Sequence, residues 1–165
     1  MIEVINDNII NAKEKYIAHQ CNAVTNRAMG VALSLFEKFP YSNIYSLRAF
    51  PHKPKSDELP GNIFIKGNGI EDRFIVNMIA QFYPGKPKIS NSKIDGYEIR
   101  IKYFRECLIK ISKIDNLESI AFPYKIGCGL ADGDWNKYLE ILENFSKYIN
   151  EKYKATVKLY CHDSK

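Results

Sequence analysis

The stretch 122–135, FPYKIGCGLADGDW, is the feature that most constrains how this chain can fold. An apolar run leads into a segment with glycines at 127, 129 and 133, and an amphipathic pattern begins near Trp135. A strand, a glycine-rich loop and a helix in this order direct free backbone amides and a helix N-terminus at one spot. Such a spot favours an anion, most often a phosphate.

Strand and helix patterns alternate along the rest of the chain. Apolar runs predict strands at 3–5, 15–20, 63–65, 74–80, 120–122 and 156–160. Apolar residues at helical spacing predict helices from near Met29 to Pro40, through 44–47, from 101 to 111 and from 135 to 149. This alternation predicts one α/β domain over 1–165 with a mostly parallel sheet, in which ligands lie beyond the carboxyl ends of the strands.

Two polar segments interrupt the pattern. The segment 50–61 carries three prolines and is predicted to be a surface loop. The segment 83–95 carries Pro84, Gly85 and Pro87, which predicts either a mobile loop that covers a ligand or a plain connection.

Composition restricts the class of protein. The 165 residues have no apolar run of about 18, and the N-terminus lacks the pattern of a signal peptide, so we expect a cytoplasmic protein without a membrane partner. Four scattered cysteines, without a nearby histidine pair, predict neither a metal site nor a disulfide framework, and no cofactor is expected. The net charge of +5 favours polyanionic ligands such as nucleotides or nucleic acid, with a solvated lysine-rich surface as the alternative.

The glycine loop does not match the known phosphate loops. No Lys-Ser or Lys-Thr follows the glycines, and their spacing is one residue too long for the dinucleotide fingerprint. Six residues after Cys128 stands Asp134, where a cysteine phosphatase needs arginine. Cys21 and Arg27 do have the Cys-x5-Arg spacing, but Val24 stands where such loops need small residues, which disfavours a thiolate phosphatase. A backbone-lined anion site of another type remains.

Three polar loops follow strands and are expected at one edge of the sheet: 6–8, 19–30 and 127–133. Asp7 can accept from an amino group, or form a turn or helix cap. Asn22 can donate to and accept from a sugar hydroxyl. His19 can exchange a proton near neutral pH, or be structural.

Together these loops resemble the macro domain, the ADP-ribose-binding fold, over nearly the whole chain. The matching segments are Asn6 to Ile9, Ile17 to Asn22, Arg27 to Ala32 and, most specifically, Gly127 to Trp135. The resemblance implies a three-layer α/β/α sandwich around a mixed, mostly parallel sheet. It also implies an ADP-ribose site, with Asp7 on the adenine amino group and Asn22 on the distal ribose. The implied site comprises Asp7, Asn8, Asn22, Ala28, Met29, Gly30, Val31, Gly127, Cys128, Gly129, Leu130, Ala131 and Gly133.

Within that family, His19, the strand VNMIAQ at 76–81 and the motif GCGLAxGDW are similar to the Appr-1-p processing branch, which removes the phosphate of ADP-ribose-1''-phosphate. This similarity implies catalytic roles for His19, as a proton donor, and Asp132, which orients water; the alternative is that Asp132 or Asp134 caps the following helix. Phe82 and Ala131 stand where hydrolase relatives carry lysine and aspartate.

Other functions stay open beside this phosphatase. They are a mono-ADP-ribosyl hydrolase acting on modified protein or nucleic acid, a non-catalytic ADP-ribose reader, and a basic nucleic-acid module. We expect a monomer that requires no metal.

Overall fold

A six-stranded sheet forms the centre of the computed structural model, which describes residues 2–49 and 52–162. The strand order is β1-β6-β5-β2-β4-β3. The strands are β1 (Ile2–Ile5), β2 (Tyr16–Asn22), β3 (Ile63–Lys66), β4 (Phe74–Gln81), β5 (Ser119–Pro123) and β6 (Thr156–Tyr160). Neighbouring strands run parallel except β3, which pairs antiparallel with β4. The predicted mixed, mostly parallel sheet is therefore confirmed.

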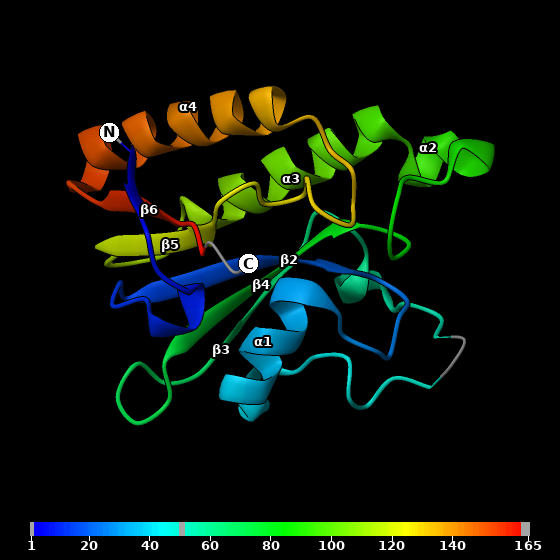
Figure 1. Ribbon diagram of the computed structural model, residues 1–165, viewed down its shortest axis with the longest axis horizontal. Helices are drawn as coiled ribbons and strands as arrows, with labels where there is room; N and C mark the ends of the chain where they lie inside the picture. The colour runs from blue at the N-terminus through cyan, green and yellow to red at the C-terminus, as the bar shows by residue number, and fades with distance from the viewer. Residues whose placement is uncertain (1, 50–51, 163–165) are drawn as a thin grey trace.

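Helices cover both faces of this sheet (Figure 1). On one face lie α3 (Tyr97–Ile111) and α4 (Trp135–Tyr153), and on the other lies α1 (Gly30–Lys38). The shorter helices are α2 (Ser92–Asp95) and the 3-10 turns η1 (Ile9–Asn11), η2 (Pro40–Ser42), η3 (Ser56–Glu58) and η4 (Ile89–Asn91). The predicted three-layer α/β/α sandwich is confirmed.

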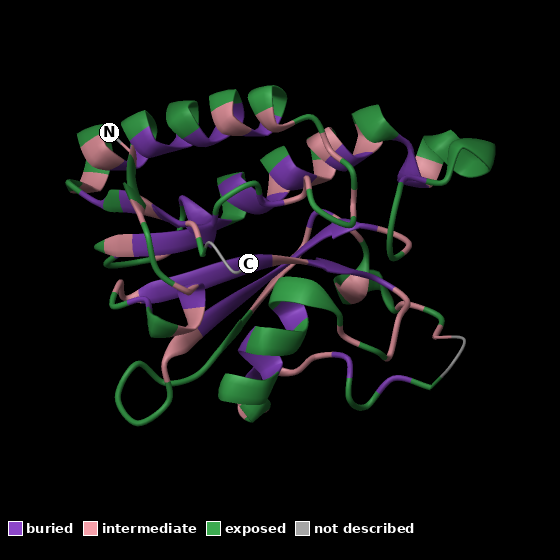
Figure 2. Cartoon of the chain, in the orientation of Figure 1, coloured by how far each residue is buried: buried purple, intermediate pink, exposed green. Residues whose placement is uncertain are grey.

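The buried strands and the inner faces of the helices form the core (Figure 2). Along α4, Tyr138, Leu142, Phe145 and Ile149 repeat at helical spacing and pack against the sheet, while the outer face is solvated. Lys154 ends the helix in the left-handed conformation, with φ 60°. Packing of this face, rather than intrinsic propensity, supplies most of the stability of the helix.

The predicted helix through 44–47 is wrong. That stretch forms bends and a turn, because the side-chain carbonyl of Asn43 accepts from the Tyr45 amide at 2.9 Å and replaces helical pairing. The Tyr45 hydroxyl also accepts from the Asn22 amide at 2.9 Å, which ties the turn to the end of β2. Of the predicted surface loop, residues 50 and 51 lie outside the described residues, and 52–61 is irregular apart from η3.

The five parallel strands end at the same edge of the sheet, because parallel pairing aligns their carboxyl ends. The segments 6–8, 23–29, 82–88 and 124–134 leave the sheet at this edge. The expected gathering of the three polar loops is therefore confirmed, and a fourth segment, 82–88, joins them.

Candidate functional site

Two of the gathered loops touch each other. A Cβ atom built on Gly30, at the start of α1, would lie 3.7 Å from Cδ1 of Leu130 in the glycine loop. Met29 and Leu130 are both largely exposed, so their side chains form a rim rather than core. The segments 23–30 and 127–133 therefore lie next to each other at the carboxyl edge, and we call the space between them the candidate cleft.

The glycine loop closes on itself through its own backbone. The Gly133 amide donates to the carbonyl of Gly127 at 3.0 Å, and the Asp132 amide donates to Gly129 at 3.0 Å. A Cβ on Gly133 would lie 2.5 Å from the Gly127 carbonyl oxygen, and Gly127 has a φ of 76°. Both positions therefore need glycine, whereas Gly129 has open space around it.

Three consecutive amides of this loop are free. Within residues 2–49 and 52–162, the N–H groups of Gly129, Leu130 and Ala131 donate to no protein acceptor. Across the cleft, α1 begins at Gly30 without a side-chain cap and without an acidic residue in its first turn. Successive free amides and an uncapped helix N-terminus both attract negative charge.

The N-terminus of α4 does not contribute as expected. Asp134 is its N-cap, and the carboxylate accepts from the Asn136 amide at 3.1 Å. The helix end is therefore already satisfied by a carboxylate of the chain, and α1 supplies the free helix N-terminus instead. Asp132 is not a cap: it has a φ of 63°, and its carboxylate accepts from the Tyr97 hydroxyl at 2.7 Å.

His19 lies in the core rather than on the cleft surface. It is 1% exposed, packs edge-on against Phe36, and its Nε2 lies 2.6 Å from Oδ1 of Asn77. Burial lowers the pKa of His19 to about 4, with the Asn77 hydrogen bond opposing the shift. The expected proton exchange between His19 and a ligand does not fit this position, and the structural alternative does.

Asn22 organises the loop that follows β2. Its Oδ1 accepts from the amides of Val24 and Thr25 at 3.1 and 2.8 Å, and its Nδ2 donates to the Tyr45 hydroxyl at 3.3 Å. Arg48 donates to the carbonyls of Asn22 and Thr25. The wall of the cleft formed by 23–30 is therefore shaped by side-chain hydrogen bonds rather than by regular structure.

Asp7 stands at the end of the edge strand β1. Its Oδ1 accepts from the Asn11 side chain at 3.0 Å and from the Asn8 amide at 2.7 Å. These two hydrogen bonds, the Asn11 one first, lower the pKa of Asp7, so it is ionised at neutral pH. Asn8 caps η1 by accepting from the Ile10 amide. The exposed Asp7 carboxylate keeps its second oxygen for an external donor.

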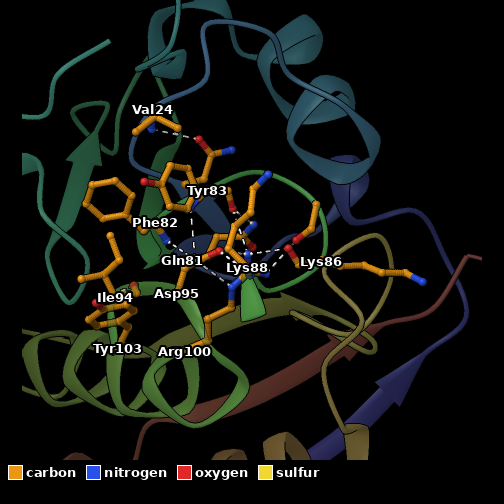
Figure 3. Close-up of polar contacts among 12 residues, drawn as sticks. Val24, Gln81, Phe82, Tyr83, Lys86, Lys88, Ile94, Asp95, Arg100 and Tyr103 are labelled. Carbon is orange, nitrogen blue, oxygen red and sulfur yellow. Dashed lines mark hydrogen bonds and ion pairs between the residues drawn. The ribbon is translucent and has the colours of Figure 1, made fainter. Parts of the chain in front are cut away.

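The segment 82–88 lies beside 23–30, because the Ala23 amide donates to the Phe82 carbonyl at 3.0 Å, and we call it the third wall. A buried ion pair holds it (Figure 3). Asp95 and Arg100 are 0% and 2% exposed in their side chains and lie 2.7 Å apart. Asp95 accepts from the amides of Phe82, Tyr83 and Lys88, and Arg100 donates to the carbonyls of Tyr83, Gly85 and Lys86. This network favours the plain connection over the mobile loop.

Arg100 and Tyr97 contribute to the site although no role was predicted for them from the sequence. One signal was available: Arg100 falls four residues before Phe104 on the apolar face of α3, and a charge at a core position requires a partner. Tyr97 carries no such signal, because its contact with Asp132 joins residues 35 positions apart.

The thiolate alternative is disfavoured by burial. Cys21 is 1% exposed, and burial raises the pKa of its thiol to about 12. Cys21 therefore lacks both the access and the ionisation of a phosphatase nucleophile.

The described ranges lack two kinds of feature, a metal-ligating cluster and a membrane-spanning helix. Neither 2–49 nor 52–162 holds a cluster of three or more metal-ligating side chains. In the same ranges, every helix is too short or too polar to cross a membrane.

Solved structures share this arrangement. No model of a known protein family and no curated protein sequence matches the chain. The macrodomain of Mycobacterium tuberculosis DarG is 19% identical to this chain, with a TM-score of 0.70, and the alignment covers 97% of both chains. The macrodomain of Thermus aquaticus DarG is 20% identical, with a TM-score of 0.67 and an alignment that covers 99% of both chains. The Trypanosoma brucei macrodomain in complex with ADP-ribose is 12% identical with a TM-score of 0.65, covering 97% of this chain and 63% of that one. The protein therefore has the macrodomain fold.

Proposed function

We propose that this protein binds ADP-ribose in the cleft at the carboxyl edge of the sheet. The observation that carries the proposal is the row of three free amides at 129–131, which faces the uncapped start of α1. A pyrophosphate carries oxygens on two adjacent phosphorus atoms, and it matches two such groups of donors better than a single small anion does. The similar fold of a macrodomain solved with ADP-ribose supports the choice of ligand.

The residues at the edges of the cleft suggest where the adenine and the distal ribose of ADP-ribose bind. The ionised carboxylate of Asp7 accepts from the adenine amino group, and Asn8 lies beside it. The distal ribose lies near Asn22 and the 28–31 segment, and the glycine loop 127–133 covers the pyrophosphate. In this arrangement the glycines allow backbone amides to approach the phosphates closely.

We further propose that the protein removes the phosphate of ADP-ribose-1''-phosphate. The Asp132 carboxylate takes a proton from a water molecule whose oxygen adds to phosphorus, the bond from phosphorus to the ribose oxygen breaks, and the protonated Asp132 returns that proton to the leaving ribose oxygen. The hydroxyl of Tyr97 holds Asp132 at 2.7 Å on the exposed side of the loop. His19 acts from the core, where it supports the strands that carry the cleft.

A mono-ADP-ribosyl hydrolase acting on modified protein or nucleic acid is the second candidate. The net charge of +5 favours a polyanionic partner, and the fold is shared with the DarG macrodomains. Phe82 and Ala131 supply no acid, base or cation to such a reaction. A non-catalytic ADP-ribose reader is the third candidate, favoured by the burial of His19.

Binding is tested first, by thermal unfolding with and without ADP-ribose. Free ligand at 100 times its dissociation constant adds about 2.7 kcal/mol to the free energy of unfolding. ADP-ribose is expected to raise the unfolding temperature, and ribose 5-phosphate at the same concentration to raise it much less. The absence of any shift at millimolar ADP-ribose would contradict the proposal.

The three candidates are then separated by their products. ADP-ribose-1''-phosphate, ADP-ribosylated protein and ADP-ribosylated DNA are offered in parallel. Release of inorganic phosphate from the first alone supports the phosphatase. Release of ADP-ribose from either of the others supports the hydrolase, and tight binding with no product supports the reader.

A further inference from the structure

A pocket of about 230 Å³ lies on the other side of the glycine loop from α1. Its walls come from the first turns of α3 and α4 and from the loop residues Ala131 and Gly133. Leu130 lies near Gly30 at the candidate cleft, and the next residue, Ala131, lines this pocket. The pocket therefore adjoins the cleft, with one stretch of loop backbone bordering both.

Two buried donors in the pocket have unused hydrogen-bonding capacity. Tyr138 is 2% exposed and lines the pocket, yet its hydroxyl has no hydrogen-bond partner in the part of the chain that the structure describes. Arg100 is also 2% exposed, and of the two N–H groups on its Nη1, one donates to Gly85 and the other has no acceptor among the same residues. The side chains of Tyr138 and Arg100 are largely buried, and the polar groups of such side chains are usually paired, so these unused donors on the pocket wall are available to a ligand.

The charges around the pocket are mixed. Lys137 brings a free ammonium group, and the pocket lies at the N-terminal end of α3, where the helix dipole is positive. The N-terminal end of α4 is already capped by the Asp134 carboxylate, and a second carboxylate, that of Asp132, accepts from the lining residue Tyr97. The charge of Arg100 is balanced by Asp95. Burial raises the pKa of Tyr138 above its ordinary value, so the hydroxyl stays protonated and can donate.

We propose that this pocket is a second anion subsite, which holds the extra phosphoryl group of an ADP-ribose phosphomonoester while the cleft holds the ADP-ribose part. This inference rests on the proposed function, and it assigns substrate selectivity to Lys137, Tyr138 and Arg100. The phosphoryl oxygens accept from the Tyr138 hydroxyl, from the free N–H of Arg100 and from the Lys137 ammonium.

Binding affinities test the subsite without relying on turnover. The dissociation constants of ADP-ribose and ADP-ribose-1''-phosphate are measured by calorimetry for the wild-type protein and for Lys137→Met, Tyr138→Phe, Asp134→Asn and Lys147→Met. Lys147 lies exposed further along α4 and serves as the matched control for loss of one positive charge. Asp134→Asn removes a negative charge while keeping a residue that caps helices well.

The proposed subsite predicts that Lys137→Met and Asp134→Asn, which remove charges of opposite sign, have opposite effects on binding of the phosphomonoester. Lys137→Met weakens binding of the phosphomonoester about tenfold or more, because a hydrogen bond to a charged group is lost, and leaves ADP-ribose binding unchanged. Tyr138→Phe acts in the same direction, and Asp134→Asn strengthens binding of the phosphomonoester several-fold because a repulsion is removed. Lys147→Met changes neither affinity.

Other outcomes overturn the inference separately from the proposed function. If Lys137→Met weakens both ligands equally or neither, the pocket is not a phosphoryl subsite, although ADP-ribose binding stands. If the wild-type protein binds neither ligand, the proposed function is wrong. In that case the pocket is tested by titrating the protein with inorganic phosphate alone and following the amide resonances of residues 131–138. Shifts that occur in the wild-type protein and disappear in Lys137→Met support an anion subsite. The absence of shifts in the wild-type protein overturns it.

Discussion

The Nε2–H of His19 donates to Oδ1 of Asn77 across 2.6 Å, and the other contacts of Asn77 fix this direction. The Nδ2 group of Asn77 donates to the carbonyls of Ser42 and Phe64 at 3.2 and 3.3 Å. Because Nδ2 faces two acceptors, Oδ1 must face the imidazole, where a protonated Nε2 donates to it at 2.6 Å and the Cys21 thiol is a weaker donor at 3.7 Å. His19 on β2 thus bonds Asn77 on β4, and Asn77 in turn bonds the turn after α1. Burial lowers the pKa of the imidazole, so the ring is neutral at neutral pH.

The stability of the protein should therefore depend on pH through His19. Burial lowers the folded-state pKa to about 4, below the ordinary value of 6.5, so the unfolded chain binds the extra proton between these two values. The stabilising contribution is complete above pH 6.5 and is lost as the pH falls toward 4, with a slope of about 1.4 kcal/mol per pH unit. Urea unfolding at a series of pH values measures this slope.

His19→Gln is the control for that measurement, since it keeps a side-chain donor and removes the titration. The difference in unfolding free energy between wild type and variant should grow with rising pH between 4 and 6.5 and be constant above. A difference that is independent of pH would contradict the buried neutral histidine. A large loss of phosphate release in folded His19→Gln, with stability unchanged, would restore the catalytic role that the sequence suggested.

Two glycines of the same loop should respond differently to alanine. In Gly133→Ala the new methyl group would meet the Gly127 carbonyl oxygen at 2.5 Å and the Tyr138 ring at 2.9 Å, so the loop has to open. We expect the dissociation constant of ADP-ribose to rise about tenfold or more, since the amides at 129–131 lose their arrangement. Calorimetric titration of the folded variant measures this change.

Gly129→Ala is the matched control, because nothing lies within 4 Å of its added methyl group and its φ is not positive. The amide itself is retained, so affinity should stay within about twofold of wild type. Equal losses in both variants would show that the loop tolerates no side chain at all. Unchanged affinity in Gly133→Ala would show that the loop is not the anion site.

The fold could be predicted from the sequence because local patterns and global arrangement agree. The apolar runs that become β2 and β4 are buried on both faces, and the 3.6-residue repeat of α4 is unbroken from Tyr138 to Ile149. The edge at which polar loops gather then follows from parallel pairing alone. The predicted helix through 44–47 failed, because the side chain of Asn43 competes for a backbone amide and sequence periodicity does not record that competition.

The site was less predictable, because its decisive contacts join distant residues. The sequence predicts His19 as a reactive group at the end of a strand, but in the structure Phe36 from α1 and Asn77 from β4 enclose its side chain. Asp132 and Asp134 stand two residues apart and are chemically alike, but only the latter caps α4, whereas Tyr97 engages the former. The position of α3 decides which carboxylate contacts Tyr97, and the local sequence carries no information on it.

The buried ion pair should be costly to break. Asp95→Ala leaves the Arg100 guanidinium uncompensated at 2% exposure, which typically costs about 3–5 kcal/mol, and it frees the amides of Phe82 and Tyr83. Urea unfolding measures the loss, and hydrogen exchange should show faster exchange of those two amides.

Glu118→Ala, which breaks the exposed pair with Lys15 at 3.7 Å, should cost less than about 1 kcal/mol. Comparable losses in the two variants would contradict the view that the pair holds the third wall.

Asp7 should determine which base the cleft accepts. Its exposed carboxylate is ionised and keeps one oxygen free, so it is suited to accept from the exocyclic amino group of adenine. Inosine diphosphate ribose carries a carbonyl oxygen at that place, which the carboxylate repels. The wild-type protein should therefore bind ADP-ribose about tenfold or more tightly than the inosine analogue, as expected for one hydrogen bond to a charged group.

Asp7→Ala should remove this discrimination. The dissociation constant of ADP-ribose rises, that of the inosine analogue falls or stays constant, and the ratio of the two approaches one. Glu3→Ala is the control, since Glu3 lies on β1, the strand that leads to Asp7, is exposed and pairs with Lys158 at 3.0 Å. Its removal changes the local charge equally but should leave the ratio intact. A ratio that persists in Asp7→Ala would place adenine elsewhere, because discrimination between an amino group and a carbonyl requires a polar group within hydrogen-bonding distance of that position.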